Sequence, residues 1–293
     1  MNASTAHVKG ELRGLHTRAM KRLGQHFLID SNVLDTIISA SDLEPTDTVV
    51  EIGPGLGALT EQLVSKAGKV IAIEVDSRLA TALSRKFSSV PGLTVMNANI
   101  LDIDPCELVK PQDPSQSLGV TNKHTDYKVI ANLPYYVASP ILRHFLEASL
   151  KPSLMVVMVQ KEVAQSIVAG PGAMSLLGIS VQLYGKPTIV DYVPAQSFYP
   201  KPKVDSAIVS IDIYPTPAVD VENMDRFFEV VKAGFSTPRK QLRNSLSIGL
   251  QLPLAEVAEI LEKASISPQR RPQTLSLEEW ADLYRAITRT GTS

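Results

Sequence analysis

The sequence contains a single cysteine, Cys106, among its 293 residues. One thiol excludes an internal disulfide and any zinc site built from several cysteines, and it suits a reducing compartment. No apolar run approaches the roughly 18–20 residues that a membrane-spanning helix needs. Residues 1–27 also lack the apolar core of a signal peptide. We therefore expect a cytoplasmic protein that has no membrane partner.

The net charge of −1 gives no overall sign of a nucleic-acid partner, but the charge is unevenly distributed. Residues 1–30 carry five Lys or Arg against two acids, and residues 232–243 carry four Lys or Arg and no acid. Arg270 and Arg271 form a third cluster. Such clusters are either ordinary solvated surface or an anion-binding face assembled from separate segments. Charge alone leaves both readings open.

Short apolar runs alternate with helical patterns over the first two-thirds of the chain. Leu59, Leu63 and Val64 repeat at helical spacing after the first run, and Leu79, Leu83 and Phe87 do so after the second. This alternation predicts a doubly wound α/β sheet, parallel through most of its strands. The predicted strands cover residues 48–52, 69–74, 93–96, 127–131, 154–159 and 206–213.

The last quarter of the chain has a different pattern. Strand signals stop after the proline-marked residues 214–220, and the pattern Ser276-x-x-Glu279 is typical of a helix N-terminal capping box. We expect two domains, 1–214 with the sheet and 215–293 with helices, and a polar surface insertion at 110–126. The predicted C-terminal helices cover residues 223–235, 239–250, 254–264 and 277–289.

The first motif that carries chemistry is TVVEIGPGLGALTEQL, in which a strand leads into Gly53, Gly55 and Gly57 and then a helix. Glycines allow a close approach of the backbone to a ligand, and the helix N-terminus offers free N–H donors. The second strand ends at Glu74, where a carboxylate can hold the hydroxyls of a ribose. The spacing GxGxG favours a cofactor with one nucleoside and no pyrophosphate, while a non-functional glycine turn stays open.

The second motif, VIANLPYYVASPIL, starts as an apolar strand and ends in Asn132-Leu133-Pro134-Tyr135. Ligands of doubly wound sheets bind at the carboxyl ends of the strands. The Asn132 amide offers an acceptor and a donor, Pro134 restricts Leu133 to extended geometry, and Tyr135 offers a flat ring. The pattern suits a planar substrate that bears an amino group. A plain turn with core tyrosines is the alternative, and we interpret Tyr136 as packing.

Two further segments place basic residues beside apolar ones. In QSFYPKPKVDSAIVSI, Phe198 is by itself more typical of a core residue than of a ligand contact, but the nearby Lys201 and Lys203 favour a nucleic-acid substrate. The segment KRLGQHFLID (21–30) is basic and precedes the sheet. No pattern typical of a metal cluster, a nucleophile–His–acid triad or a P-loop occurs in the sequence, so we expect no metal.

Taken together, these motifs resemble the ribosomal RNA adenine dimethyltransferase family over nearly the whole chain. The resemblance rests on KRLGQHFLID, EIGPGLGALT, IAIEVD, VIANLPYYVASPIL, QSFYPKPKVDSAIV, FSTPRKQLRNSL and RRPQTLSLEEWADLY. The last of these is similar to the branch that dimethylates two adjacent adenines in a hairpin loop near the 3′ end of small-subunit rRNA. Close relatives that methylate large-subunit rRNA share the catalytic half.

The resemblance implies a Rossmann-like S-adenosylmethionine-dependent methyltransferase sheet and a small all-helical, rRNA-binding C-terminal domain. It implies a monomer that acts on small-subunit rRNA in the immature small ribosomal subunit. The family usually has Asp where this chain has Asn99, and often Asn where it has His26. The implied catalytic residues are Asn132, Leu133, Pro134, Tyr135 and Phe198. The implied cofactor-binding residues are His26, Leu28, Gly53, Gly55, Glu74, Asn99 and Asn132. Candidate RNA contacts are Arg18, Lys21, Arg22, Lys201, Lys203, Arg239, Lys240 and Arg243.

The expected reaction is methyl transfer to the exocyclic amine of adenine, carried out twice. Asn132 and the carbonyl of Leu133 or Pro134 would hold the amine, and the flipped base would stack between Tyr135 and Phe198. Two other classes of function stay open. One is an rRNA chaperone or assembly checkpoint, and the other is an NAD-dependent oxidoreductase, which the glycine spacing disfavours.

Overall fold

The structure is a computed structural model of the chain, and it describes residues 5–109 and 126–289. Contacts divide these residues into two compact units. Unit 1 comprises the described residues of Met1–Ala164 and Lys186–Ile213, and unit 2 those of Gln165–Gly185 and Tyr214–Ser293. The sequence predicts a domain boundary after residue 214, and the contacts differ in grouping Gln165–Gly185 with the C-terminal helices. Most of the expected insertion, residues 110–125, lies outside the described residues.

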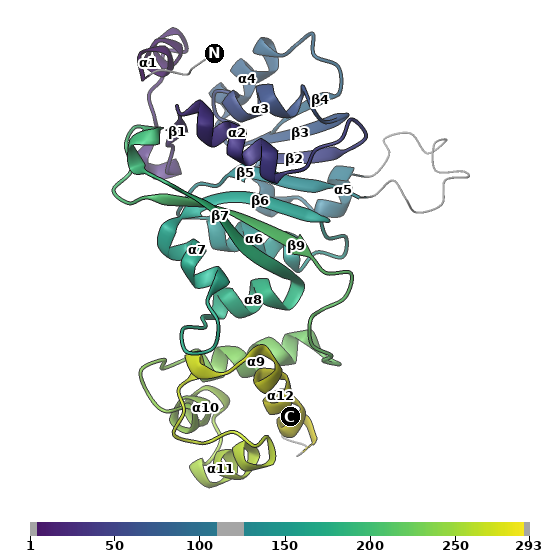
Figure 1. Cartoon of the computed structure of the whole chain (residues 1–293), viewed down its shortest axis with the longest axis vertical. Helices are drawn as coiled ribbons and strands as arrows, with labels where there is room; N and C mark the ends of the chain where they lie inside the picture. The colour runs from purple at the N-terminus through teal and green to yellow at the C-terminus, as the bar shows by residue number, and fades with distance from the viewer. Residues whose placement is uncertain (1–4, 110–125, 290–293) are drawn as a thin grey trace, which may run out of the picture. The chain divides into compact units, whose positions relative to one another are not determined.

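Unit 1 is built on a seven-stranded sheet with the order β4-β3-β2-β5-β6-β9-β7 (Figure 1). The first five of these strands run parallel, and β9 pairs antiparallel with β6. A second, two-stranded antiparallel ribbon joins β1 to β8. The strands are β1 (Phe27–Leu28), β2 (Thr48–Ile52), β3 (Lys69–Glu74), β4 (Leu93–Asn97), β5 (Lys128–Asn132), β6 (Leu154–Gln160), β7 (Gly185–Val193), β8 (Phe198–Tyr199) and β9 (Ser206–Ile213).

The six predicted strands are confirmed, with shifts of at most one residue at their ends. The central strands are buried on both faces, which explains their continuous runs of Val and Ile. The sequence prediction missed β1, β7 and β8. Two-residue strands are too short to show a period, and β7 is an edge strand with a Gly-Lys-Pro start and a largely exposed pattern.

Helices of unit 1 connect these strands (Figure 1). Helices α3 and α4 contact β3, α4 also contacts β4, and α2 contacts α3 and β6. Asp30 caps α2 and Asp76 caps α4 by accepting backbone N–H groups of the first turn. The helices that lie in unit 1 or start there are α1 (Thr5–Gly14), η1 (Lys21–Leu23), α2 (Ser31–Ala40), α3 (Ala58–Leu63), α4 (Ser77–Lys86), η2 (Ile100–Asp102), α5 (Pro105–Val109), α6 (Ala138–Leu146), α7 (Lys161–Val168) and η4 (Ala195–Ser197).

Unit 2 contains the predicted C-terminal helices. The capping box at the last of them is confirmed: the Ser276 N–H donates to Glu279, and the Glu279 N–H donates to the Ser276 hydroxyl. Trp280 is fully buried and stacks on Phe235. The helices are α8 (Leu176–Tyr184), α9 (Met224–Phe235), α10 (Leu242–Leu250), α11 (Leu254–Lys263), η5 (Pro272–Thr274) and α12 (Leu277–Arg289). Within the described residues, no helix is long and apolar enough to cross a membrane.

Candidate functional site

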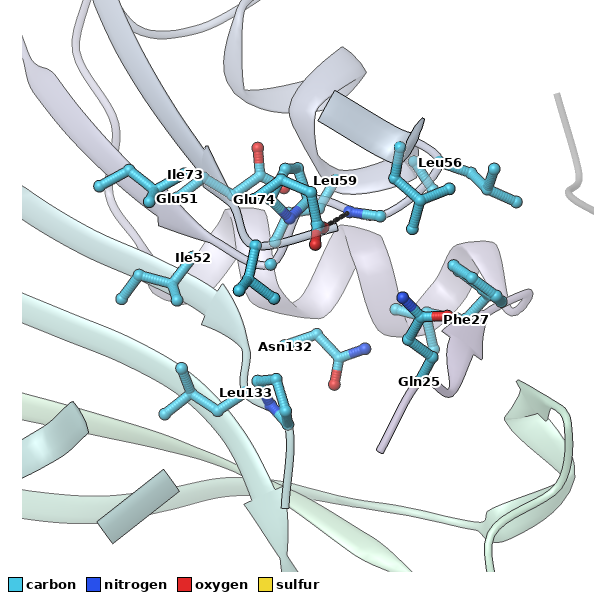
Figure 2. Close-up of a pocket in the computed structure, with 18 of the residues that line it drawn as sticks. Gln25, Phe27, Glu51, Ile52, Leu56, Leu59, Ile73, Glu74, Asn132 and Leu133 are labelled. Carbon is cyan, nitrogen blue, oxygen red and sulfur yellow. Dashed lines mark hydrogen bonds between the residues drawn. The ribbon is translucent and has the colours of Figure 1, made fainter. Parts of the chain in front are cut away.

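A cavity of about 780 Å³ opens at the carboxyl ends of β2, β3 and β5 in unit 1. This is the edge of the sheet at which doubly wound folds bind their ligands, and the volume is within the range of small-molecule sites. Figure 2 shows side chains from separate segments around it, among them Gln25, Glu74 and Asn132. The sequence-predicted residues that line it are His26, Leu28, Gly53, Gly55, Glu74, Asn99, Asn132, Leu133, Pro134 and Tyr135.

The glycine loop forms one wall of the cavity. Gly53, Gly55 and Gly57 all have positive φ angles, of 67°, 59° and 85°, in the left-handed region that other residues rarely adopt. A Cβ atom on Gly57 would also lie 2.6 Å from Leu83 and 2.8 Å from Phe87. The three glycines are therefore required by backbone conformation, and at Gly57 also by packing.

Glu74, at the end of β3, joins the glycine loop to the rim of the cavity. Its carboxylate accepts the Gly55 N–H at 3.1 Å (Figure 2). It also accepts the Asp76 N–H at 2.9 Å. Burial raises the pKa of Glu74, and the two backbone donors oppose that shift. Each carboxylate oxygen keeps a further lone pair, so Glu74 can hold the loop in place and accept hydroxyl hydrogens of a ligand as well.

Asn132 is the last residue of β5 and lines the same cavity (Figure 2). Its side-chain NH₂ donates to the carbonyl of His26 at 3.2 Å, which fixes the orientation of the amide. The Oδ1 atom is thereby left as an acceptor for a ligand. The Pro134 carbonyl accepts the Val137 N–H at 3.1 Å. Of the two backbone carbonyls named as acceptors, that of Leu133 is therefore the better placed to accept from a substrate amine.

His26 contacts two other segments of unit 1, residues 132–135 and Pro200. Its Nδ1 donates to the Pro200 carbonyl at 2.6 Å, and its ring stacks on Tyr135 with centroids 5.6 Å apart. The Tyr135 hydroxyl shares a hydrogen bond of 2.5 Å with Ser206. Burial raises the pKa of Tyr135, so its hydroxyl keeps its proton at neutral pH. Tyr135 therefore offers a ring surface rather than a base.

Two aromatic residues are placed differently from the sequence interpretation. Phe198 is 3% exposed, pairs with Leu28 across the β1–β8 ribbon and packs in the main core of unit 1. It lies outside the set of described residues that line the cavity. Tyr135 lines the cavity and Phe198 does not, and the stacking of a base between them stays a prediction. The interpretation of Tyr136 as packing is wrong, because Tyr136 is 60% exposed.

Asn99 caps η2 at the cavity wall. Its Oδ1 accepts the Leu101 N–H at 3.3 Å and its Nδ2 donates to Asp102 at 3.1 Å. The Asp102 carboxylate thus accepts a hydrogen bond from the Asn99 amide. A role for Asn99 in cofactor binding stays a prediction.

The basic candidates for RNA contact occur in both units. In unit 1, Arg18, Arg22, Lys201 and Lys203 are exposed, and Lys21 lies in η1 with a side chain outside the described part. In unit 2, Arg239 and Lys240 are exposed and Arg243 is partly buried. Their contact with RNA stays a prediction. No group of three or more potential metal-ligating side chains occurs among the described residues.

Sequence reasoning missed two parts of the cavity. Helix α1 contributes His7, Val8 and Glu11 to the lining, although the spacing of Val8, Leu12 and Leu15 would have indicated a helix with one apolar face. The buried acid Glu51 also lines the cavity. The sequence feature that could have indicated Glu51 is a charged residue inside the predicted buried strand TVVEI.

The buried Glu51 predicts a pH dependence of stability. Burial raises its pKa to about 8; the Thr60 hydroxyl, at 2.7 Å, opposes the shift, and Glu74 adds to it. Between about pH 5 and 8 the native protein therefore holds a proton that the unfolded chain has lost. The free energy of unfolding should fall as pH rises through this window, by up to about 1.4 kcal/mol per pH unit.

Urea unfolding of the unliganded protein at pH 5 and pH 8 measures this effect. Glu51→Gln should show a shallower fall than the parent protein, because the amide has no proton to lose. The exposed Glu61→Gln is the matched control and should keep the parental slope. Equal slopes for all three proteins would contradict the raised pKa.

Comparison with known proteins adds to this geometry. The family model described as "Ribosomal RNA adenine dimethylase" matches residues 16–286. The chain is 48% identical over 283 residues to "Ribosomal RNA small subunit methyltransferase A" of Dehalococcoides mccartyi strain 195, covering 97% of this chain and 93% of that protein.

Two solved structures are similar over most of their length. One is a dimethyladenosine transferase from Plasmodium falciparum, with a TM-score of 0.73 and 27% identity over 91% of this chain and 98% of that one. The other is the 23S rRNA methyltransferase ErmE, with a TM-score of 0.66 and 26% identity over 89% of this chain and 99% of that one.

Proposed function

The chain belongs to the ribosomal RNA adenine dimethylase family, and on this premise we propose that it dimethylates the 6-amino groups of two adjacent adenines near the 3′ end of small-subunit rRNA, with S-adenosylmethionine as the methyl donor. The family predicted from the sequence motifs is confirmed, and so is the Rossmann-like sheet. The proposed substrate is the rRNA of the immature small subunit, and the proposed active form is a monomer that needs no metal.

One observation carries the proposal. The oriented Oδ1 acceptor of Asn132 and the carboxylate of Glu74 line the same cavity, together with the glycine loop. An acceptor for an amine and a binding site for a nucleoside cofactor are thus brought together. When bound, S-adenosylmethionine supplies a methyl group on a positively charged sulfur.

The cavity fits S-adenosylmethionine on three counts. Its volume suits one nucleoside with an amino-acid arm. The glycine loop allows close approach of the ligand to the backbone, because glycine has no side chain. Glycine also adopts the positive φ angles of this loop without strain. Glu74 supplies acceptors for ribose hydroxyls, and Asn99 lines the cavity. His26 and Leu28 close it from the N-terminal segment.

Residues at the carboxyl end of β5 would then bind the 6-amino group of the target adenine. The adenine amine is a weak nucleophile because its lone pair is delocalised into the ring. We assign Asn132 Oδ1 and the Leu133 carbonyl to accept the two hydrogens of the unmethylated amine, which favours a tetrahedral nitrogen with its lone pair directed at the methyl donor. Each of the two transfers would form one N–C bond in place of one S–C bond and release one amine proton to water. Preorganised acceptors and in-line positioning supply the rate enhancement, and Tyr135 supports the base by stacking.

Small-subunit rRNA is favoured over large-subunit rRNA by the degree of similarity. The relative named for small-subunit methylation is 48% identical to this chain, whereas the 23S rRNA methyltransferase is 26% identical. Exposed basic residues in the turn between α9 and α10, Arg239 and Lys240, support an rRNA-binding role for that domain. The same two residues, Arg239 and Lys240, also support an additional function as an assembly factor, because they can bind rRNA without catalysis.

A methylation assay tests the proposal. The purified chain and S-adenosylmethionine should form dimethyladenosine, detected by mass spectrometry of RNA digests, on immature small-subunit particles. Naked large-subunit rRNA should remain unmodified. Dimethyladenosine on the large-subunit RNA alone would reverse the substrate assignment. RNA binding without any methylated product would favour a chaperone or assembly role instead.

A further inference from the structure

Tyr136 lies at the mouth of the cavity and faces solvent. Among the exposed large hydrophobic side chains in the described part of the chain it is the most exposed, at 60%. It nevertheless belongs to the set of residues that line the cavity, directly after Tyr135. An aromatic ring in this position can contact both a ligand inside the cavity and the part of a larger ligand that stays outside it.

One edge of the ring lies against the backbone of Gly24. A Cβ atom on Gly24 would lie 3.2 Å from Cδ1 of Tyr136, so the ring rests closely against the Gly24 main chain. Gly24 has a φ of 58°, which favours glycine at this position. The rest of the Tyr136 side chain stays exposed and offers an aromatic surface to solvent.

The chemistry around this surface suits one strand of RNA. A base that enters the cavity stays linked through its phosphates to neighbours that remain at the mouth. An exposed aromatic ring there can stack on such a neighbour, because every base has a π-face. Arg22 is exposed and lies two residues before Gly24, and it can pair with the connecting phosphate.

We propose that Tyr136 is a positioning residue that stacks on the nucleotide next to the adenine being methylated. The inference rests on the proposed function and extends it to the part of the RNA strand that stays outside the cavity. Stacking on the neighbour holds the RNA strand while the target base occupies the site. Tyr136 therefore acts on RNA binding and not on cofactor binding or on the transfer step.

Steady-state methylation of immature small-subunit particles tests this role. Tyr136→Ala should raise KM for the particle about tenfold, the order expected for loss of one base–aromatic stack. Its kcat should stay within about twofold of the parent, and so should the dissociation constant for S-adenosylmethionine measured by calorimetry. Tyr136→Phe keeps the ring and should restore the parental KM.

Tyr192→Ala is the matched control, since Tyr192 is also exposed, at 48%, but does not line the cavity. It should leave KM unchanged. A parental KM for Tyr136→Ala, with methylation intact in the parent, overturns this inference and leaves the proposed function standing. An equal rise in KM for Tyr192→Ala also overturns the assignment to Tyr136. If the unmodified protein makes no dimethyladenosine, both the proposed function and the stacking role of Tyr136 are contradicted.

Discussion

Replacing Asn132 with alanine is expected to lower kcat for adenine methylation about 100- to 1,000-fold, the usual loss for one preorganised hydrogen-bonding group at a reacting centre. The side chain removed is the acceptor whose orientation the His26 carbonyl fixes. Asn132 is only partly buried, and its backbone remains the last residue of β5. The loss should therefore be in the chemistry and not in the fold.

Single-turnover methylation with saturating S-adenosylmethionine measures this loss, and circular dichroism checks the fold. Asn132→Asp is an informative second variant. It keeps an acceptor but places an unpaired carboxylate against the His26 carbonyl, so its activity should also fall. Asn32→Ala, at an exposed position on α2, is the control and should keep full activity. A rate for Asn132→Ala within tenfold of the parent would remove the amine-holding role.

Replacing Glu74 with alanine is expected to weaken binding of S-adenosylmethionine about 100-fold. Hydrogen bonds to a charged group contribute about 1.5–3 kcal/mol each, and this carboxylate is assigned to the ribose. The substitution also leaves the N–H groups of Gly55 and Asp76 without their acceptor. The glycine loop then keeps its backbone bond to β3, from the Gly53 N–H to the Ile73 carbonyl, but loses the side-chain contact at Gly55.

Isothermal titration calorimetry measures the affinity. Glu74→Gln should lie between the parent and the alanine variant, because its amide oxygen can accept one N–H while its NH₂ group faces the other donor. Glu162→Ala removes an exposed acid on α7 outside the cavity and should bind as the parent does. An unchanged dissociation constant for Glu74→Ala would show that this carboxylate does not hold the cofactor.

The central fold could be predicted because its strands are buried on both faces. Such strands read as continuous apolar runs, and the helices between them repeat at a helical period. The short strands β1 and β8 could not be predicted in this way. They exist because Phe27 and Leu28 pair with residues about 170 positions further along the chain, and no local pattern records such a pairing.

The site could be predicted in part for a similar reason. The rule that ligands bind at the carboxyl ends of parallel strands brings Gly53, Glu74 and Asn132 together from sequence alone. The burial of Phe198 and the exposure of Tyr136 could not be predicted, since aromatic residues suit cores and stacking surfaces equally well. The orientation of the Asn132 amide depends on a carbonyl 106 residues away.

His26 has a consequence for exchanging segments between relatives. Its ring nitrogen binds Pro200 in one segment, and its ring face and carbonyl bind Tyr135 and Asn132 in a second segment. The N-terminal segment 21–30 is therefore not an independent module. A chimera that takes this segment from another family member should regain full activity only when residues 132–135 and 197–201 come from the same donor.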